Sequence, residues 1–192
     1  IGATALNYNT KGSNNIAVGS AALFNNKEGN YNIATGNNAL HNNTDGSNNI
    51  AMGTNALYAN TTGIQNVAIG ANSISVNTTG NYNVATGTEA LQSNTGSWNV
   101  ANGHQALKAN TTGNSNIAIG ANSLGSNVGG SNNVAMGSSA LQANKTGIQN
   151  IAIGEIALSN NVSGSGNVAI GYQTLFIGAA GSHNTAVGHN AD

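Results

Sequence analysis

The chain of 192 residues carries four Lys, no Arg and five acidic residues, and its formal net charge is −1, so nothing in it attracts nucleic acid or an acidic membrane surface. Cys is absent, which excludes disulfides and thiolate metal sites. No apolar run approaches the roughly 18 residues of a membrane span, and no signal peptide is visible. A chain rich in Asn, Gly, Thr and Ser could be disordered, but a regular apolar pattern argues for an ordered one.

One sequence motif recurs along the whole chain. The tetrapeptide Asn-(Ile/Val)-Ala-x, followed by Gly, begins at Asn15, Asn32, Asn49, Asn66, Asn83, Asn99, Asn116, Asn133, Asn150, Asn167 and Asn184. Successive copies lie 17 residues apart (32 − 15), except for one interval of 16 (99 − 83). The deletion falls in "SNTGS", which shortens a turn and spares the strands. Leu or Ile, a second Asn and a second Gly recur with the same phase, which indicates a repeat architecture.

Each unit is too short for a helix–turn–helix repeat, which needs over about 30 residues. In the unit 47–63, the alternation of large and small residues predicts a strand at 48–53. A turn, a short strand at 56–59 and a second turn at 60–63 complete the coil. Gly supplies the positive φ of the turns, and Asn stacked on Asn forms amide ladders.

The sequence therefore predicts an all-β, parallel β-solenoid of about eleven 17-residue coils, a single domain over residues 1–192. Coils stacked about 4.8 Å apart would give a rod on the order of 50 Å long.

The direction of the strand side chains decides the oligomeric state. If the Ala column points inward against one Leu per coil, the branched aliphatic residues form a stripe on the outside of the solenoid. Soluble monomers rarely expose so much apolar surface, so we would then expect this stripe to bind a partner chain. A homotrimer would bury it, with the interface formed by Ile16, Val18, Ile33, Ile50, Met52, Val67, Ile69, Val84, Val100, Ile117, Ile119, Val134, Met136, Ile151, Ile153, Val168 and Ile170. The rival interpretation puts Ile and Val inside and leaves a monomer. Polar residues at Thr35, Thr86 and Asn102 would suit a water-filled axial cavity.

The segments "QNVAIG" (65–70), "SNIAIG" (115–120), "QNIAIG" (149–154) and "GNVAIG" (166–171) resemble the head repeat of YadA-like trimeric autotransporter adhesins. Similar repeats occur in phage tail-fibre-like proteins. The resemblance covers nearly the whole chain, although the coil is longer than is usual in that family, and no stalk or barrel anchor lies in this stretch. It implies a left-handed β-roll, three chains around one axis and a role in attachment.

The function expected from this resemblance is that of a structural and binding segment of an extracellular trimeric adhesin, in a fibre anchored to the bacterial outer membrane. Its partner would be a host surface protein or glycan. The alternative is a phage-type tail fibre shaft or receptor-binding segment on a virion. The segment itself is not expected to span a membrane.

Few residues suit catalysis or metal binding. Glu28 and Asp45 share a turn column with Lys11, which predicts a solvated charged turn, and Glu89 stands in another column from Glu155. His104 and His189 share a column but lie five coils, or roughly 24 Å, apart, too far for one metal ion. We expect no enzyme activity, cofactor or metal site.

Aromatic residues fall in register on outward columns. Phe24, His41 and Tyr58 occupy one position in three consecutive coils, and Tyr82 and Trp98 share another position, which Tyr31 also occupies. They could contact a sugar or a protein, or they could form a ladder that only stiffens the rod.

Two further features complete the pattern. Ice binding, a lesser alternative, needs a column of identical small residues, whereas the column after the first Gly is varied: Ser20, Asn37, Thr54, Ala71, Thr88, His104, Ala121, Ser138, Glu155, Tyr172 and His189.

The last coil, 172–192, brings Phe176 and Ile177 and has Gly178 in place of the second Asn. We expect a junction to a following module there, in a segment of a longer fibrous protein.

Overall fold

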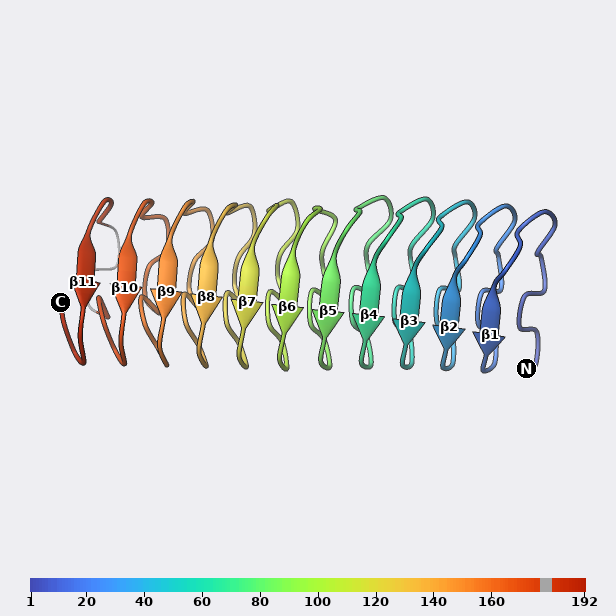
Figure 1. Ribbon diagram of the computed structural model, residues 1–192, viewed down its shortest axis with the longest axis horizontal. Helices are drawn as coiled ribbons and strands as arrows, with labels where there is room; N and C mark the ends of the chain where they lie inside the picture. Colours follow the sequence, from blue (N-terminus) through green and yellow to red (C-terminus); the bar gives the residue numbers. More distant parts are fainter. Residues whose placement is uncertain (177–180) are drawn as a thin grey trace.

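The computed structural model describes residues 1–176 and 181–192. Within them, eleven three-residue strands form one parallel sheet in chain order, one strand in each coil of a solenoid (Figure 1). The strands are β1 (Ile16–Val18), β2 (Ile33–Thr35), β3 (Ile50–Met52), β4 (Val67–Ile69), β5 (Val84–Thr86), β6 (Val100–Asn102), β7 (Ile117–Ile119), β8 (Val134–Met136), β9 (Ile151–Ile153), β10 (Val168–Ile170) and β11 (Thr185–Val187). The predicted all-β parallel solenoid with its spacing of about 17 residues is confirmed.

The strands pair in register along the whole sheet. Val84 of β5 lies opposite Val100 of β6, so the one-residue deletion between them leaves the pairing intact. In the part of the chain that the structure describes, no helix has the length and apolarity needed to cross a membrane. Ile177 and Gly178 of the last coil lie outside the described residues.

The interior of the tube is narrow and is filled by small side chains and Leu. The central Ala of every strand from β1 to β10 is buried, and its two neighbours point outward. From Leu23 to Leu158 the Leu column, in which Ile74 replaces one Leu, is fully buried beside it, whereas Leu6 and Leu175 are partly buried. A second small residue per coil, which the sequence analysis did not place inside, is buried just before that Leu: Ala22, Ala39, Ala56, Ser73, Ala90, Ala106, Ser123, Ala140, Ala157 and Thr174. The interpretation that put Ile and Val inside is therefore wrong.

The second strand expected in each coil is absent from the described residues, and a run of turns takes its place. In the coil 49–65, Asn55 has φ 56° and Leu57 has φ 52°, the left-handed region that side chains other than Gly rarely adopt. Hydrogen bonds still join the coils, because the Leu57 N–H donates to the Ser73 carbonyl at 3.1 Å. The strain is offset by the complete burial of Leu57 and of its equivalents from Leu23 to Leu158.

The two Gly columns serve different purposes. Gly53 and its equivalents have φ near 130°, as the sequence analysis expected. Gly46 and its equivalents lack a positive φ, so that expectation is wrong for the second column. There a Cβ would lie 2.7 Å from the Asn60 Nδ2 atom, and it would also meet the Gly63 carbonyl. This column is Gly because amide ladders pass directly beside the backbone.

Two buried ladders of Asn side chains run along the solenoid and confirm the predicted stacking, although the turn ladder is interrupted at the short coil. In the turn ladder, formed by the second Asn of each coil, Asn60 Nδ2 donates to Asn43 Oδ1 at 2.8 Å and to the Gly63 carbonyl at 3.0 Å. In the strand ladder, formed by the Asn before each strand, Asn66 Nδ2 donates to Asn49 Oδ1 at 3.2 Å and to a turn carbonyl at 2.9 Å. Each ladder satisfies backbone carbonyls that would otherwise be buried without a partner.

A third ladder, which the sequence analysis missed, lies three residues before each strand. Here the side-chain oxygen of one coil accepts from the backbone N–H of the coil before it. The Ser13 N–H donates to Asn30 Oδ1 at 2.8 Å, and the Asn30 N–H donates to Ser47 Oγ at 3.0 Å. The sequence signal is weak because Ser and Asn alternate irregularly and Ile64 and Ile148 interrupt the column.

The short coil breaks the turn ladder. Asn94 Nδ2 donates to the Gly96 carbonyl at 2.9 Å, but among the described residues nothing donates to the buried Oδ1 of Asn77. Asn94 instead accepts from Asn99 of the strand ladder at 3.2 Å. The deletion is therefore tolerated at the cost of one buried acceptor.

Filling the tube should destabilise it. We predict that Ala68→Ile lowers the free energy of unfolding by about 1–3 kcal/mol, because the closed coil has no space for three extra carbon atoms. Urea unfolding at a fixed chain concentration measures this. Val67→Ile, which adds one methylene to the neighbouring outward side chain, should change it by less than about 0.5 kcal/mol. Equal effects of the two substitutions would contradict the inward orientation of Ala.

Restoring the missing turn residue should stabilise the chain. We predict that inserting Thr between Thr95 and Gly96, to give the Asn-Thr-Thr-Gly of other coils, raises the free energy of unfolding by about 1–3 kcal/mol, because the Asn77 oxygen regains a donor. The same insertion between Thr62 and Gly63 makes an 18-residue coil and should destabilise. If both insertions lower the stability, the gap in the ladder is not a defect.

Candidate functional site: an apolar stripe and aromatic columns

The outward aliphatic side chains of the strands form a continuous apolar stripe. We use this name for the aliphatic first and third residues of the strands, which include every residue predicted for the interface. The first residues are half-buried or exposed, whereas the aliphatic third residues are exposed: Met52 is 44% exposed and Ile119 is 38% exposed. In-register pairing sets each side chain of the stripe directly beside its equivalent in the next coil.

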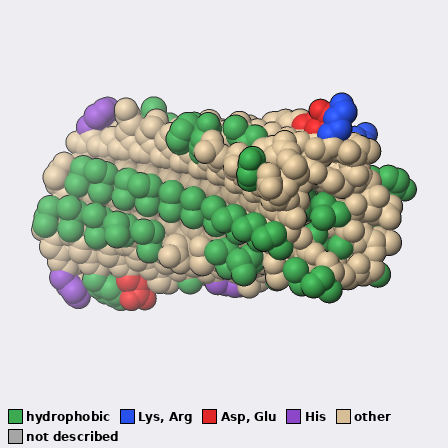
Figure 2. All heavy atoms as spheres, turned by 45° about the vertical axis from the view of Figure 1, so that its right-hand side comes forward, with side chains coloured by type: hydrophobic (Ala, Val, Ile, Leu, Met, Phe, Trp, Pro, Cys, Tyr) green, Lys and Arg blue, Asp and Glu red, His purple; other side chains and the backbone are tan. Residues whose placement is uncertain are grey.

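Figure 2 shows hydrophobic side chains in parallel rows along the length of the molecule. Polar residues interrupt the third-residue row at three of the strands, where Thr35, Thr86 and Asn102 replace an aliphatic residue. Thr86 and Asn102 pair with one another, so they form one polar break two coils long. The stripe is thus apolar over most of its length, and one of its two rows carries the breaks.

The predicted stack of Phe24, His41 and Tyr58 is present. The ring centroids of Phe24 and His41 are 5.0 Å apart with an interplanar angle of 10°, and those of His41 and Tyr58 are 5.2 Å apart at 24°. Tyr8, which stands one position further along its coil, in the column of Asn25, makes an edge-on contact with Phe24 at 5.0 Å. The rings of Phe24, His41 and Tyr58 lie outside the apolar stripe, in the column directly after the buried Leu.

A second predicted pair, Tyr82 and Trp98, stacks more closely, with ring centroids 4.0 Å apart at 15°. Trp98 is 59% exposed, and Tyr31 of the same column is 60% exposed. All three residues have a φ between 56° and 63°. The sequence carried no sign of this conformation, because bulky residues rarely adopt it. A third stack, between Tyr172 and His189 at 5.2 Å, was missed although the two residues share a column.

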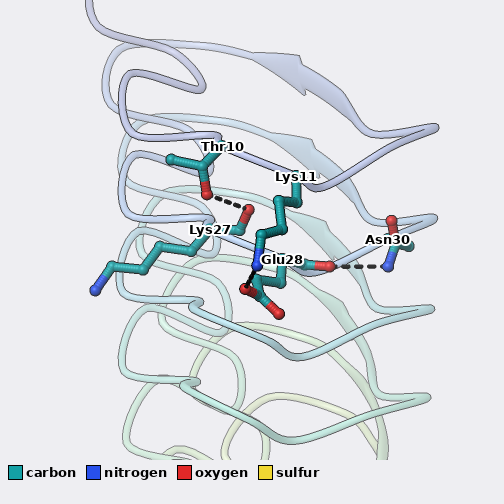
Figure 3. Close-up of polar contacts among 5 residues, drawn as sticks. All are labelled: Thr10, Lys11, Lys27, Glu28 and Asn30. Carbon is teal, nitrogen blue, oxygen red and sulfur yellow. Dashed lines mark hydrogen bonds and ion pairs between the residues drawn. The ribbon is translucent and has the colours of Figure 1, made fainter.

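The charged turn near the first coils is solvated, as the sequence analysis expected. Lys11 Nζ donates to Glu28 Oε1 at 2.7 Å, and both side chains are exposed (Figure 3). This hydrogen bond lowers the pKa of Glu28 and raises the pKa of Lys11 from their ordinary values. Thr10 and Asn30 donate to the backbone carbonyls of Lys27 and Glu28 in the same turn. This turn is a surface feature in which the side chains of Thr10, Lys11 and Asn30 donate hydrogen bonds within the chain.

Glu89 has partners that sequence reasoning did not find. Lys108 Nζ and Gln105 Nε2 each donate to its Oε2 atom at 2.8 Å. Hydrogen bonds from Lys108 and Gln105 lower the pKa of Glu89. The partners come from the next coil, 16 and 19 residues along the chain. Gln105 shares the column of Glu89, whereas Lys108 stands in a different column and is missed when only equivalent positions are compared.

Some of the turn threonines use their hydroxyl groups within the chain. Thr61 Oγ1, for example, donates to the Thr78 carbonyl of the next coil at 3.0 Å, and Thr95 and Thr111 make the equivalent bond. These hydroxyls therefore reinforce the stacking of the turns. Ice binding stays a prediction, which thermal hysteresis would test.

Across residues 1–176 and 181–192, no group of three or more His, Asp or Glu side chains is arranged to hold a metal ion. Comparisons with family models, with curated proteins and with solved structures find no match to this chain. The candidate functional surfaces are therefore defined by geometry alone: the apolar stripe on the strands and the aromatic columns on other parts of the coil.

Proposed function

We propose that this chain is a structural and binding segment of an extracellular trimeric adhesin, which attaches to surfaces or host cells. The observation that carries the proposal is the exposed apolar stripe. The interior of the tube is already filled by Ala and Leu, so the stripe has no shelter within its own chain. It continues over nearly the whole length of the solenoid, and such surfaces mark protein interfaces.

Rotational symmetry makes three chains a suitable assembly. Closed homo-oligomers use cyclic symmetry, and obligate interfaces are more apolar than the rest of the surface. Each strand contributes side chains to both rows of the apolar stripe. In a ring of three chains, one row is therefore available for each of the two neighbouring chains. The polar break at Thr86 and Asn102 would then face an axial space that holds water.

The remaining surface suits a fibre that works outside the cell. Only nine side chains are formally charged at neutral pH (four Lys and five acidic residues), and the ion pairs of Lys11 and Lys108 cancel some of them locally. A surface with so few charges has little electrostatic interaction for salt to screen. The resemblance of the strand motif to YadA-like head repeats supports the same assignment.

A charge within the stripe should prevent both assembly and attachment. We predict that Ile117→Asp lowers the melting temperature by roughly 10 °C or more and removes its dependence on chain concentration, because burial between chains would desolvate the carboxylate. Beads coated with the variant should lose their adhesion to cultured epithelial cells in the same preparation.

Thr112→Asp is the matched control, because it places the same charge on an exposed turn residue one coil earlier, away from the strands. It should keep the melting behaviour and the adhesion of the unmodified chain. The proposal fails if Ile117→Asp behaves like this control, or if beads coated with the unmodified chain do not adhere.

A further inference from the structure

A groove of about 400 Å³ lies beside the last ring of the aromatic stack, away from the apolar stripe. Its lining residues are Asn38, Asn55, Tyr58, Ala59, Asn72, Ser75 and Val76. We propose that this groove, which we call the Tyr58 groove, binds one neutral pyranose ring of a glycan. The proposal gives a ligand class to the attachment role proposed above and rests on that role for its biological use.

The stack of aromatic rings ends at Tyr58 with one face uncovered. His41 of the preceding coil covers the other face at 5.2 Å. In the following coil the same column holds Ser75, whose side chain is too short to cover the ring, and Ser75 itself lines the groove. Tyr58 is 36% exposed. A flat ring of C–H groups placed against this face would continue the stack by one member, and the apolar face of a pyranose supplies such a ring.

Part of the groove lining next to Tyr58 is apolar. In the two preceding coils the column after the aromatic residue holds Asn25 and Asn42, which are joined by a hydrogen bond of 3.2 Å. The next two coils have Ala59 and Val76 in that column, and Val76 is 48% exposed. The row of amides therefore ends where the groove begins, and the exchange creates an apolar strip beside the uncovered face of Tyr58.

Another part of the lining, the column of Asn38, Asn55 and Asn72, is polar and has unused hydrogen-bonding groups. Asn38 Nδ2 donates to Asn55 Oδ1 at 3.3 Å, and Asn55 Nδ2 donates to Asn72 Oδ1 at 3.2 Å. Within the described part of the chain, Asn72 Nδ2 donates no hydrogen bond and Asn38 Oδ1 accepts none. The row thus ends in a donor at one side and an acceptor at the other. Hydroxyl groups of a sugar both donate and accept, so they match these two ends.

The size of the groove and the charge of its lining residues narrow the class of ligand further. All seven lining residues are uncharged, which favours a neutral sugar over a sialylated or sulfated one. Ligand sites usually enclose about 300–1,000 Å³, so the groove suits one ring and its substituents. A single ring held on one side should bind with a dissociation constant of about 1 mM or weaker. Several copies on one fibre would raise the avidity by linking these weak events.

Saturation-transfer difference NMR tests the proposal. The probes are the methyl glycosides of glucose, galactose and N-acetylglucosamine, each in millimolar excess over the purified chain. We expect saturation of the ring C–H protons of at least one glycoside. Tyr58→Ala should reduce this signal about fivefold or more, because the stacking face is lost. Ser75→Tyr keeps Tyr58 but covers its open face with the next ring, and it should reduce the signal equally.

Val162→Ala is the control, because Val162 is an exposed apolar residue of a turn that belongs neither to the groove nor to the apolar stripe or the aromatic columns. It should keep the signal within about twofold, and circular dichroism checks that each variant is folded. No saturation of any of the three glycosides by the unmodified chain would overturn the proposal, as would an undiminished signal from the folded Ser75→Tyr variant. The molar mass of the same samples reports the assembly separately, so failure of the sugar site is distinguishable from failure of the proposed function.

Discussion

The whole structure depends on how little space the solenoid leaves at the centre of each strand. The Ala column is buried in every coil from Ala17 to Ala169, and a second small residue and one Leu fill the rest of the interior. Interiors are packed as densely as organic crystals, so this tube cannot also accept Ile or Val. The branched residues on both sides of each Ala must therefore point outward. The exposed stripe is a direct consequence of the narrow core, and the proposed assembly follows from the stripe.

Polar ladders hold the coils together where this small core is insufficient. The buried Asn of each turn and strand bond to their equivalents in the next coil and to turn carbonyls, so that burial of amides adds stability instead of removing it. The same ladders account for the Gly that follows each turn, since Asn side chains occupy the space of a Cβ. They also explain why the short coil is tolerated. Asn99 links the two ladders through Asn94, and only one acceptor at Asn77 is lost.

Strict periodicity made much of the fold predictable. The positions of all the strands, the inward Ala, the Asn ladders and the stack of Phe24 on His41 follow from residues that recur every 17 positions, because equivalent residues in a solenoid lie side by side. The left-handed conformation of Leu57 was not predictable, since it depends on closure of the coil and contradicts local propensity. The contact of Lys108 with Glu89 was missed because it joins different columns. The Tyr58 groove was missed because it forms where the small side chains of Ser75 and Ala59 leave space. Small residues in a sequence do not by themselves indicate a groove.

The central claim is that the aliphatic stripe is sheltered by sister chains. It is tested most directly by the molar mass of the unmodified chain, measured by light scattering during size-exclusion chromatography. The chain mass is 19.0 kDa, so three chains should give about 57 kDa (3 × 19.0) over a wide range of concentrations. A stable species of about 19 kDa, with the stripe exposed to water, would contradict the account.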